Sequence, residues 1–285
     1  MRHIKDRNFE GERPLFGSRD LVLENVAIRA GESALKECSG VKAENCRFEG
    51  KYPFWQNDGV EIKSCLFAEG ARAAIWYSKN LLMLDTVVEA PKMFRDAGGI
   101  RLENVRLPNA AETFWRCSGV ELKGARADRG DYLFMGSSKI WIDGFILNGN
   151  YSFQYCRDVE IRNAEINSKD AFWNSENVTV RDSVIDGEYL GWHTKNLKLI
   201  NCKISGTQPL CYAKNLVMEN CSMGGDADLC FEYSTLDASI CGAVKSVKNP
   251  AGGRICADSI GEIILDENCR NPGGCEIRTN SRRSA

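Results

Sequence analysis

The sequence predicts an all-β fold, a right-handed, single-stranded parallel β-helix of about twelve coils of 19–21 residues. Three observations support this prediction. A ten-residue phrase recurs eleven times between Leu21 and Leu216. Each copy alternates apolar and polar residues, as a strand with one buried face does. Residues that favour turns flank every copy. A period of this length, repeated along most of the chain, is typical of a solenoid.

The first strand of each coil begins at an aliphatic residue in all eleven copies. A second apolar residue follows two positions later in each copy, and the residue between them is usually polar, as in Leu197-Lys198-Leu199. This period of two predicts a strand whose inward side chains form one column of the core.

Two bends separate the strands of a coil. Four residues after the first aliphatic residue stand only Asn, Asp, Ser or Gly, with Asn201 and Asn220 among them. The residue before the strand is also Gly, Asn or Asp, and Lys139 is the one exception. Most of these residue types tolerate a positive φ. We therefore expect bends at both columns, with an asparagine ladder along them.

The rest of the coil forms a second and a third strand. The second begins at a column of small or apolar residues that includes Cys46 and Cys65. The third carries a column of large apolar residues, many of them Phe, which we expect to stack inside. Right-handed crossovers are strongly favoured. A leucine-rich repeat would need a different leucine pattern and a helical segment, and no six-residue period supports a left-handed coil.

The domain prediction is a single β-helix over residues 1–266, with an N-terminal cap and a closing strand near Ile260–Leu265. Residues 267–285 are expected to be a flexible tail. The net charge of −2 comes from interleaved acidic and basic residues, which argues against nucleic acid or a membrane as partner. The first twenty residues lack an apolar run, so we expect no signal peptide and a cytoplasmic location.

Cysteine and histidine spacing suggests no metal site, and the sequence implies no cofactor. The thirteen cysteines are an odd number without an export signal, so reduced thiols are expected. Disulfides between cysteines stacked on neighbouring coils remain an alternative.

Several segments resemble a known family. They include Gly-Glu-Arg-Pro-Leu-Phe (11–16), Ala-Arg-Ala-Ala-Ile-Trp-Tyr (71–77) and Asn-Ala-Ala-Glu-Thr-Phe-Trp (109–115). From about residue 3 to residue 266 the chain resembles a bacterial family of unknown function in the pectin-lyase-like right-handed parallel β-helix superfamily. The resemblance implies the fold and, by analogy alone, a polysaccharide ligand. The acidic motifs of polygalacturonase-like hydrolases are missing, and Trp141-Ile142-Asp143 resembles a pectate-lyase phrase only in part.

One column of side chains looks functional. Five of the six tryptophans follow the stacked apolar residue of the third strand: Trp55, Trp76, Trp115, Trp173 and Trp192. Arg95 shares the column, and an unpaired arginine is costly to bury, so the column is predicted to face outward. Together with Tyr77, Arg95 and His193, these rings form the expected binding surface for an oligosaccharide or another elongated ligand.

Charged residues cluster at the centre of this surface: Lys92, Asp96, Glu112, Arg116 and Asp131. Glu112 and Asp131 could form the acid and base pair of a glycosidase, because neighbouring coils lie about 4.8 Å apart. A cation beside a carboxylate could instead support β-elimination. The alternative is a solvated ladder of opposite charges without catalytic function.

Three structural interpretations compete with a ligand surface. The tryptophans could pack beneath the preceding loop, form a homo-oligomer interface, or belong to the core if the assigned parity is wrong. The sequence therefore leaves two classes of function. The first is a carbohydrate-binding or carbohydrate-modifying protein, and the second is a non-catalytic scaffold or homo-oligomer. Whether the protein is an enzyme stays open.

Overall fold

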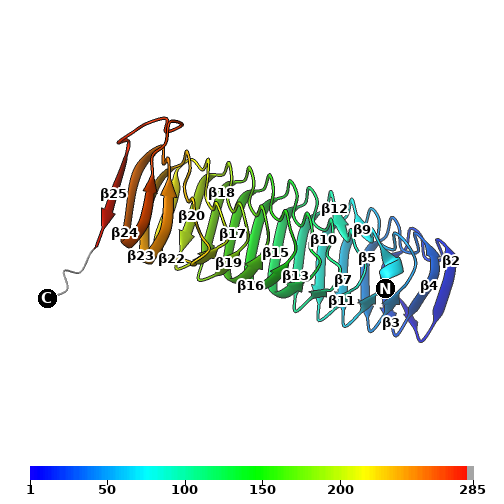
Figure 1. The fold of residues 1–285 in the computed structure, drawn as a ribbon. Coiled ribbons are helices and arrows are strands. Elements are labelled where there is room, and N and C mark those ends of the chain that lie inside the picture. The colour runs from blue at the N-terminus through cyan, green and yellow to red at the C-terminus, as the bar shows by residue number, and fades with distance from the viewer. Residues whose placement is uncertain (281–285) are drawn as a thin grey trace. The chain divides into compact units, whose positions relative to one another are not determined.

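The computed structural model describes residues 1–280, which form two compact units. Unit 1 is Met1–Gly149, and unit 2 comprises the described residues from Asn150 onward. Each unit consists of short strands wound into parallel coils (Figure 1). The fold is the predicted right-handed parallel β-helix, with about 15 turns in place of about twelve. The additional turns come from terminal strands that lack the repeated phrase.

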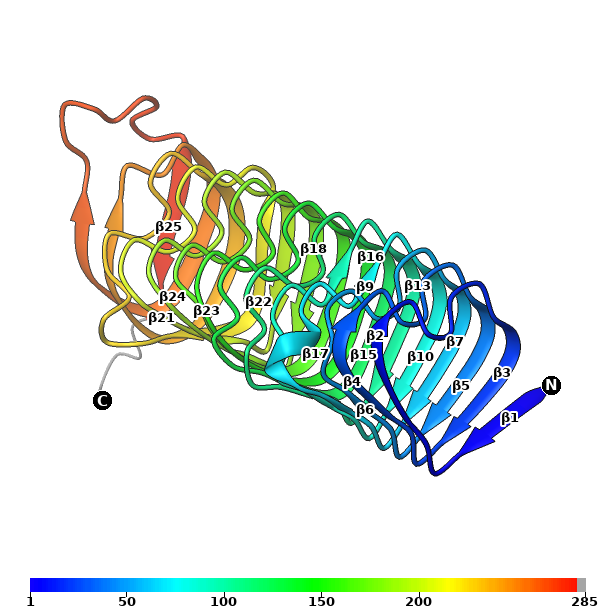
Figure 2. The ribbon, with the colours of Figure 1, turned by 90° about the vertical axis from the view of Figure 1, so that its right-hand side faces the viewer.

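In unit 1, eight successive strands form the first sheet: β1 (Arg2–Lys5), β3 (Arg19–Glu24), β5 (Ser39–Glu44), β7 (Asp58–Lys63), β10 (Lys79–Leu84), β13 (Gly98–Glu103), β15 (Ser118–Ala127) and β16 (Ser138–Asn148). Equivalent residues of the repeat lie side by side, so that Ile100 pairs with Leu81 on one side and with Val120 on the other. This in-register stacking places the aliphatic positions of the copies in unit 1 in one interior column. Figure 2 shows the strands stacked side by side.

The remaining elements of unit 1 complete its coils: β2 (Asn8–Glu12), β4 (Ala27–Glu32), β6 (Arg47–Phe48), β8 (Leu66–Phe67), β11 (Val87–Val88), β14 (Arg106–Leu107), the 3₁₀-helix η1 (Glu69–Ala71), β9 (Ile75–Trp76) and β12 (Phe94–Arg95). β9 and β12 form a separate two-stranded sheet in the third segment of the coil. Strands β15 and β16 run through the bend without a break.

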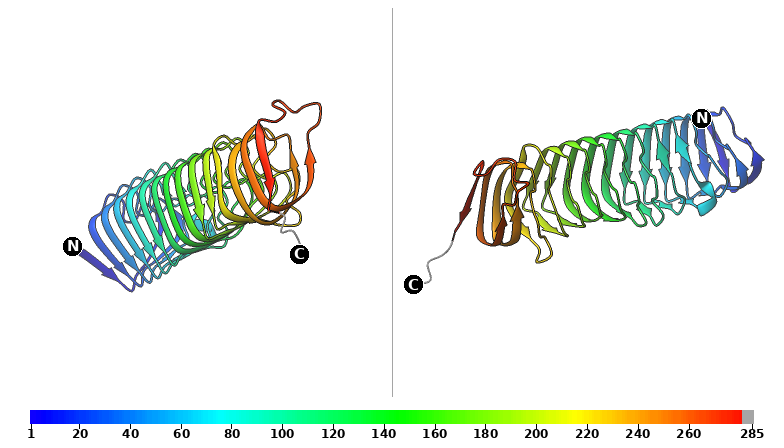
Figure 3. Two further views of the ribbon diagram at one scale, coloured as in Figure 1. Left: turned by 90° about the vertical axis from the view of Figure 1, so that its left-hand side faces the viewer. Right: turned by 45° about the horizontal axis from the view of Figure 1, so that its top comes forward.

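Unit 2 repeats the pattern in β17 (Arg157–Asn167), β18 (Glu176–Arg181), β19 (Val184–Asp186), β20 (Lys195–Ile200), β21 (Lys203–Ser205), β22 (Leu216–Met223), β23 (Thr235–Lys248), β24 (Gly252–Ile264) and β25 (Cys275–Thr279). Figure 3 shows these strands from two further sides. β25 pairs in parallel with Gly253–Ala257 of β24. The predicted flexible tail therefore contains a strand, because the edge of β24 offers hydrogen-bonding groups; residues 281–285 lie outside the described range.

The interior columns contain the predicted apolar residues. Phe94, Phe114 and Phe134 stack in unit 1 with ring centroids 4.7 and 4.6 Å apart. Phe153 and Phe172 stack at 5.0 Å in unit 2. All five rings are buried. These phenylalanines of the third segment thus face the core, as the sequence predicts.

Side chains at the bends bond from coil to coil. The amide of Asn201 donates to Asp182 Oδ1 at 2.8 Å, and the amide of Asn220 donates to Asn201 Oδ1 at 2.8 Å. Both residues have a positive φ. All thirteen cysteines are free thiols, and nine are buried. Burial raises the pKa of Cys117 to about 12. Within residues 1–280, no helix has both the length and the apolar character needed to cross a membrane.

Candidate functional site

Unit 1 carries three of the predicted tryptophans on its outside. Trp55, Trp76 and Trp115, together with Arg95, form what we call the unit-1 strip. Each of these four residues directly follows a buried apolar side chain, and alternation along the segment turns it outward. The rings are partly exposed, so the strip does not belong to the core.

The indole N–H groups of the strip bond to the backbone of the following coil. Trp55 Nε1 donates to the carbonyl oxygen of Ala73 at 2.6 Å, and Trp76 Nε1 donates to that of Lys92 at 2.7 Å. Trp115 Nε1 donates to the carbonyl oxygen of Tyr132 at 2.7 Å. These bonds satisfy the carbonyl groups of the bend. The tryptophans therefore connect each coil to the backbone of the following coil.

The flat faces of these rings are covered by one another and by Arg95. Trp55 and Trp76 stack with centroids 5.3 Å apart and an interplanar angle of 10°. The Arg95 guanidinium carbon lies 4.4 Å from the Trp76 ring centroid and 4.5 Å from that of Trp115. The Arg95 side chain is 17% exposed, and its Nε is buried without a hydrogen-bond partner. A ligand would meet mainly the edges of the strip.

Tyr77 differs from the tryptophans because its ring is 50% exposed. It meets Trp55 at an interplanar angle of 86° and Trp76 at 87°, with centroids 5.7 and 6.2 Å away. Gln56, Asp96 and Arg116 occupy the same position of the repeat on neighbouring coils, and we call these four residues the Tyr77 row. All four have a positive φ, from 49° to 58°, which fixes the direction of their side chains.

The charged residues of this region form two sets of ion pairs. Arg116 Nε and Nη2 donate to the two carboxylate oxygens of Asp96, each at 2.7 Å. The hydrogen bond to Asp96 raises the pKa of Arg116 above its usual value. Lys92 Nζ lies 2.9 Å from Glu112 Oε1, and Arg95 Nη2 lies 3.4 Å from Glu112 Oε2.

The structure thus joins Lys92, Arg95 and Glu112 in one network and Asp96 with Arg116 in another. Glu112 and Asp131 lie on neighbouring coils and are linked by a backbone hydrogen bond of 2.8 Å, from the Glu112 N–H to the Asp131 carbonyl oxygen. Each oxygen of the Glu112 carboxylate faces a cation. This arrangement matches a surface charge network better than an acid and base pair.

Unit 2 carries the remaining predicted ligand-binding residues. Trp173 and Trp192 lie 5.6 Å apart, and Trp192 Nε1 donates to the carbonyl oxygen of Gln208 at 2.8 Å. The exposed His193 ring stacks on Tyr212 with centroids 4.7 Å apart. Burial and the nearby Lys214 lower the pKa of His193. The imidazole is therefore held in an aromatic cluster as a largely neutral ring at pH 7.

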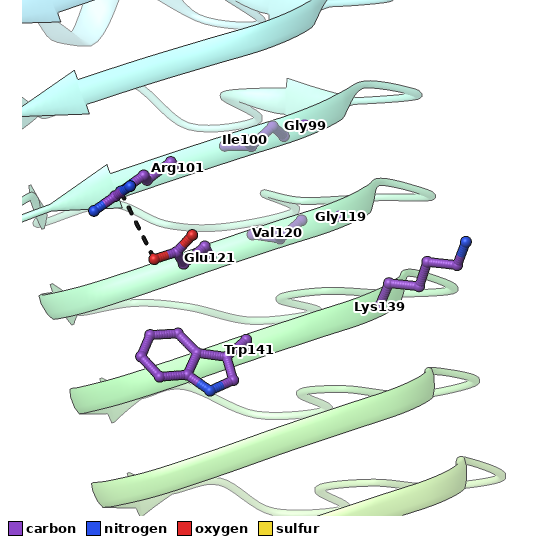
Figure 4. Close-up of a pocket in the computed structure, with 8 residues that line it drawn as sticks. All are labelled: Gly99, Ile100, Arg101, Gly119, Val120, Glu121, Lys139 and Trp141. Atoms are coloured by element: carbon purple, nitrogen blue, oxygen red, sulfur yellow. Dashed lines mark ion pairs between the residues drawn. The ribbon is translucent and has the colours of Figure 1, made fainter.

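A depression on the outer face of the first sheet of unit 1 was not predicted (Figure 4). Its volume is about 610 Å³, and it lies across β13, β15 and β16. Its lining is Gly99, Ile100, Arg101, Gly119, Val120, Glu121, Lys139 and Trp141. Two signals in the sequence point to it: Lys139 breaks a column of Gly, Asn and Asp, and Trp141 is the tryptophan outside the main column.

Metal-ligating side chains do not gather in the part of the chain that the structure describes. Among residues 1–280, no group of three or more His, Cys, Asp or Glu side chains could hold a metal ion.

The fold and its external strip define a parallel β-helix protein with a surface rich in aromatic and charged side chains. The chain belongs to the family described as Protein of unknown function (DUF3737), whose profile matches residues 2–278. No curated protein matches the chain.

Several solved structures match the chain at low similarity. The surface adhesin PfbA of Streptococcus pneumoniae is 7% identical, with a TM-score of 0.34 and coverage of 97% of this chain and 84% of that one. A tailspike protein double mutant of E. coli bacteriophage HK620 is 11% identical, with a TM-score of 0.38 and coverage of 92% and 57%. The mannuronan C-5 epimerase AlgE4 A-module of Azotobacter vinelandii is 8% identical, with a TM-score of 0.31 and coverage of 97% and 88%.

Proposed function

We propose that this protein is a non-catalytic carbohydrate-binding β-helix and that the Tyr77 row of unit 1 contacts the sugar. The observation that carries the proposal is the half-exposed Tyr77 ring, fixed at right angles to two stacked indoles. A flat, rigid ring offers apolar area for the C–H face of a pyranose at low entropy cost. Its contacts with Trp55 and Trp76 hold the ring in place before a ligand binds.

The neighbours of Tyr77 supply the polar contacts that a sugar needs. Gln56 offers an amide on one side, and the Asp96–Arg116 pair offers acceptors and donors on the other. Successive members lie on coils about 4.8 Å apart, which is close to the size of one sugar ring. The row can therefore hold hydroxyl groups on both sides of a pyranose stacked on Tyr77.

Binding is favoured over catalysis because the carboxylates of the region are already engaged. Glu112 faces Lys92 and Arg95, and Asp96 forms a two-bond pair with Arg116. Glycoside hydrolysis uses one carboxyl group that donates a proton and a second that acts as nucleophile or base. A paired carboxylate is suited to accept hydrogen bonds from sugar hydroxyls instead.

A fluorescence titration tests the proposal, because Trp55 and Trp76 contact Tyr77 and report on ligands near it. Soluble neutral and acidic oligosaccharides are titrated into the wild type, Tyr77→Ala and Tyr155→Ala. Tyr155 is a matched control at the same position of the repeat in unit 2, with 54% exposure and a φ of 58°. We expect a saturable shift in the wild type and Tyr155→Ala, and binding about tenfold weaker in Tyr77→Ala.

The outcome that contradicts the proposal is equal binding by Tyr77→Ala and the wild type, or no saturable shift with any sugar.

The protein-interface alternative rests on a different observation. Phe16 and Tyr132 of unit 1 are 43% and 39% exposed, which is typical of aromatic residues at interfaces. Light-scattering mass supports that alternative if a dimer mass of the wild type falls to a monomer mass in Phe16→Ala or Tyr132→Ala.

A further inference from the structure

The depression on the first sheet of unit 1 has a floor without side chains. Gly99 and Gly119 have φ values of 63° and 69°, a left-handed conformation that the bend requires. A Cβ atom at Gly99 would lie 3.2 Å from Asn80 Oδ1. Glycine therefore satisfies the backbone at these positions and leaves open space above the sheet, within the size range of small-molecule sites.

Lysine is an unusual residue for the left-handed backbone conformation of position 139. The other residues of this column in unit 1 are Asp20, Gly40, Gly59, Asn80, Gly99 and Gly119. Lys139 adopts the same left-handed φ, at 54°, although lysine tolerates it less well than glycine, asparagine or aspartate. Strained residues kept at the rim of a depression are candidates for function.

The ammonium group of Lys139 is unpaired. Within residues 1–280, no carboxylate lies within 4.0 Å of its Nζ. Figure 4 shows the side chain extended away from the strand, beside the glycine floor. Many other lysines of unit 1, such as Lys42, Lys79, Lys92 and Lys123, are paired with carboxylates. An unpaired cation beside an open depression attracts an anionic group.

The other walls can contact the rest of a ligand. Arg101 Nε lies 3.7 Å from Glu121 Oε1, and Arg101 Nη2 lies 3.6 Å from Glu103 Oε2. Both distances exceed that of a hydrogen bond, so the guanidinium can still donate to a ligand. Glu121 supplies acceptor oxygens, and the indole of Trp141 lines the opposite side (Figure 4). The walls therefore combine donors, acceptors and an aromatic surface.

We propose that this depression is a second binding site, which takes an anionic sugar residue with its carboxylate on Lys139, its hydroxyls on Arg101 and Glu121, and its ring beside Trp141. The site differs from the Tyr77 row in its residues and in the charge of its ligand. It extends the binding capacity of unit 1 from neutral to acidic oligosaccharides.

The test compares two tetrasaccharides by isothermal titration calorimetry. Hyaluronan tetrasaccharide carries carboxylates, and tetra-N-acetylchitotetraose is its neutral counterpart. Lys139→Asn removes the charge and introduces a residue that this column already accepts, so we expect an unchanged or higher melting temperature. Lys139→Arg retains the charge, and Lys42→Gln removes a lysine charge elsewhere on unit 1.

We expect Lys139→Asn to bind the acidic tetrasaccharide about tenfold more weakly, since a hydrogen bond to a charged group is lost. Lys139→Arg and Lys42→Gln should retain most of the wild-type affinity for it. The affinity of Lys139→Asn for the neutral tetrasaccharide should match that of the wild type. Equal affinity of Lys139→Asn and the wild type, an equal loss in Lys42→Gln, or the absence of saturable heat with the acidic ligand would overturn the proposal. If Lys139→Asn melts at a lower temperature than the wild type, Arg101→Gln replaces it in the test. Weaker binding of the acidic tetrasaccharide by folded Arg101→Gln supports the proposal, and wild-type affinity overturns it.

Discussion

The tryptophans of the outer column are bound to the backbone through their ring nitrogens. Four of them, Trp55, Trp76, Trp115 and Trp192, donate to a carbonyl oxygen of the following coil at 2.6–2.8 Å. Each bond connects a side chain of one coil to the bend of the next. The column therefore stabilises the stacking of coils as well as shaping the surface.

Replacement of Trp76 by Phe tests this stabilising role. The variant keeps an aromatic ring on Trp55 but loses the hydrogen bond to the Lys92 carbonyl oxygen. We expect a loss of about 1 kcal/mol in the free energy of unfolding, the usual net contribution of such a bond. Urea unfolding followed by circular dichroism measures it.

Trp173→Phe is the matched control. Trp173 stacks on Trp192, but its indole N–H has no hydrogen-bond partner within residues 1–280. Its replacement by Phe should change the free energy of unfolding by less than about 0.5 kcal/mol. Equal losses in the two variants would show that ring size, and not the N–H bond, accounts for the effect.

The sequence predicted the exposure of single residues correctly where the alternation of inward and outward side chains alone determines it. The presence of Arg95 in the tryptophan column indicated that the column faces outward, and the rings are partly exposed. The partners of the indole N–H groups could not be predicted, because they are carbonyl groups 16–18 residues away whose position depends on how the coils stack. The depression was missed for the same reason, since Lys139 and Gly99 come from different coils.

At the scale of elements, close contact between neighbouring coils limits which residues fit. Gly31 of β4 has a φ of 145°, and a Cβ atom there would lie 2.0 Å from the carbonyl oxygen of Gly11 in β2. Gly17 lies at a bend with a φ of 66°, and a Cβ atom there would have no other atom within 4 Å. The two glycines share a positive φ but differ in the space that a Cβ atom would have.

Substitution of each glycine by alanine separates these effects. Gly17→Ala should cost about 1 kcal/mol of unfolding free energy through backbone strain alone. Gly31→Ala adds an overlap with backbone atoms and should be less stable by a further 1–3 kcal/mol or so, about the usual cost of overpacking. Thermal unfolding of both variants measures the difference. Similar losses would mean that β2 and β4 move apart at no cost.

The sequence predicted the strands of the central coils better than those at the ends. Leu81, Ile100 and Val120 pair in the expected register, because each aliphatic residue has an equivalent on both sides. The strands β1 and β25 lack the repeated phrase. A terminal coil has a neighbour on one side only and tolerates polar residues, so its periodicity is weaker. The predicted number of coils was therefore too low.

At the scale of the whole molecule, hydrogen bonds to carboxylates predict how stability depends on pH. Asn80 and Lys79 lower the pKa of Asp58, Arg126 lowers that of Asp128, and Thr207 lowers that of Asp228, all from the usual 3.8. A carboxylate with a lowered pKa in the folded state stabilises the fold above its usual pKa. That stability is lost as the pH falls through the lowered value.

The urea midpoint of the whole chain should therefore stay nearly constant from about pH 6 to pH 5 and fall steadily below about pH 4. Unfolding curves at closely spaced pH values check this. Asp128→Asn should show a shallower fall than the wild type, because it removes one of the shifted groups. A midpoint that rises between about pH 4 and pH 3 would contradict the stabilising role of these carboxylates.

For the whole molecule, the sequence predicted only a general class of function. The repeat indicated a β-helix, and the aromatic column indicated a surface for a ligand or a partner. Which rings offer a free face depends on stacking between coils: Trp55 and Trp76 stack on each other, whereas Tyr77 is half exposed. Coil spacing predicts that Glu112 and Asp131 are neighbours, but it does not reveal that Lys92 and Arg95 engage Glu112.

The most direct test of sugar binding at Tyr77 is saturation-transfer-difference NMR of a neutral oligosaccharide with the wild type, Tyr77→Ala and Tyr155→Ala. This measurement detects which sugar protons lie against the protein. We expect strong transfer to the C–H protons of one pyranose face with the wild type and Tyr155→Ala, and loss of that pattern with Tyr77→Ala. The same pattern with Tyr77→Ala, or no transfer with the wild type, would contradict binding at this ring.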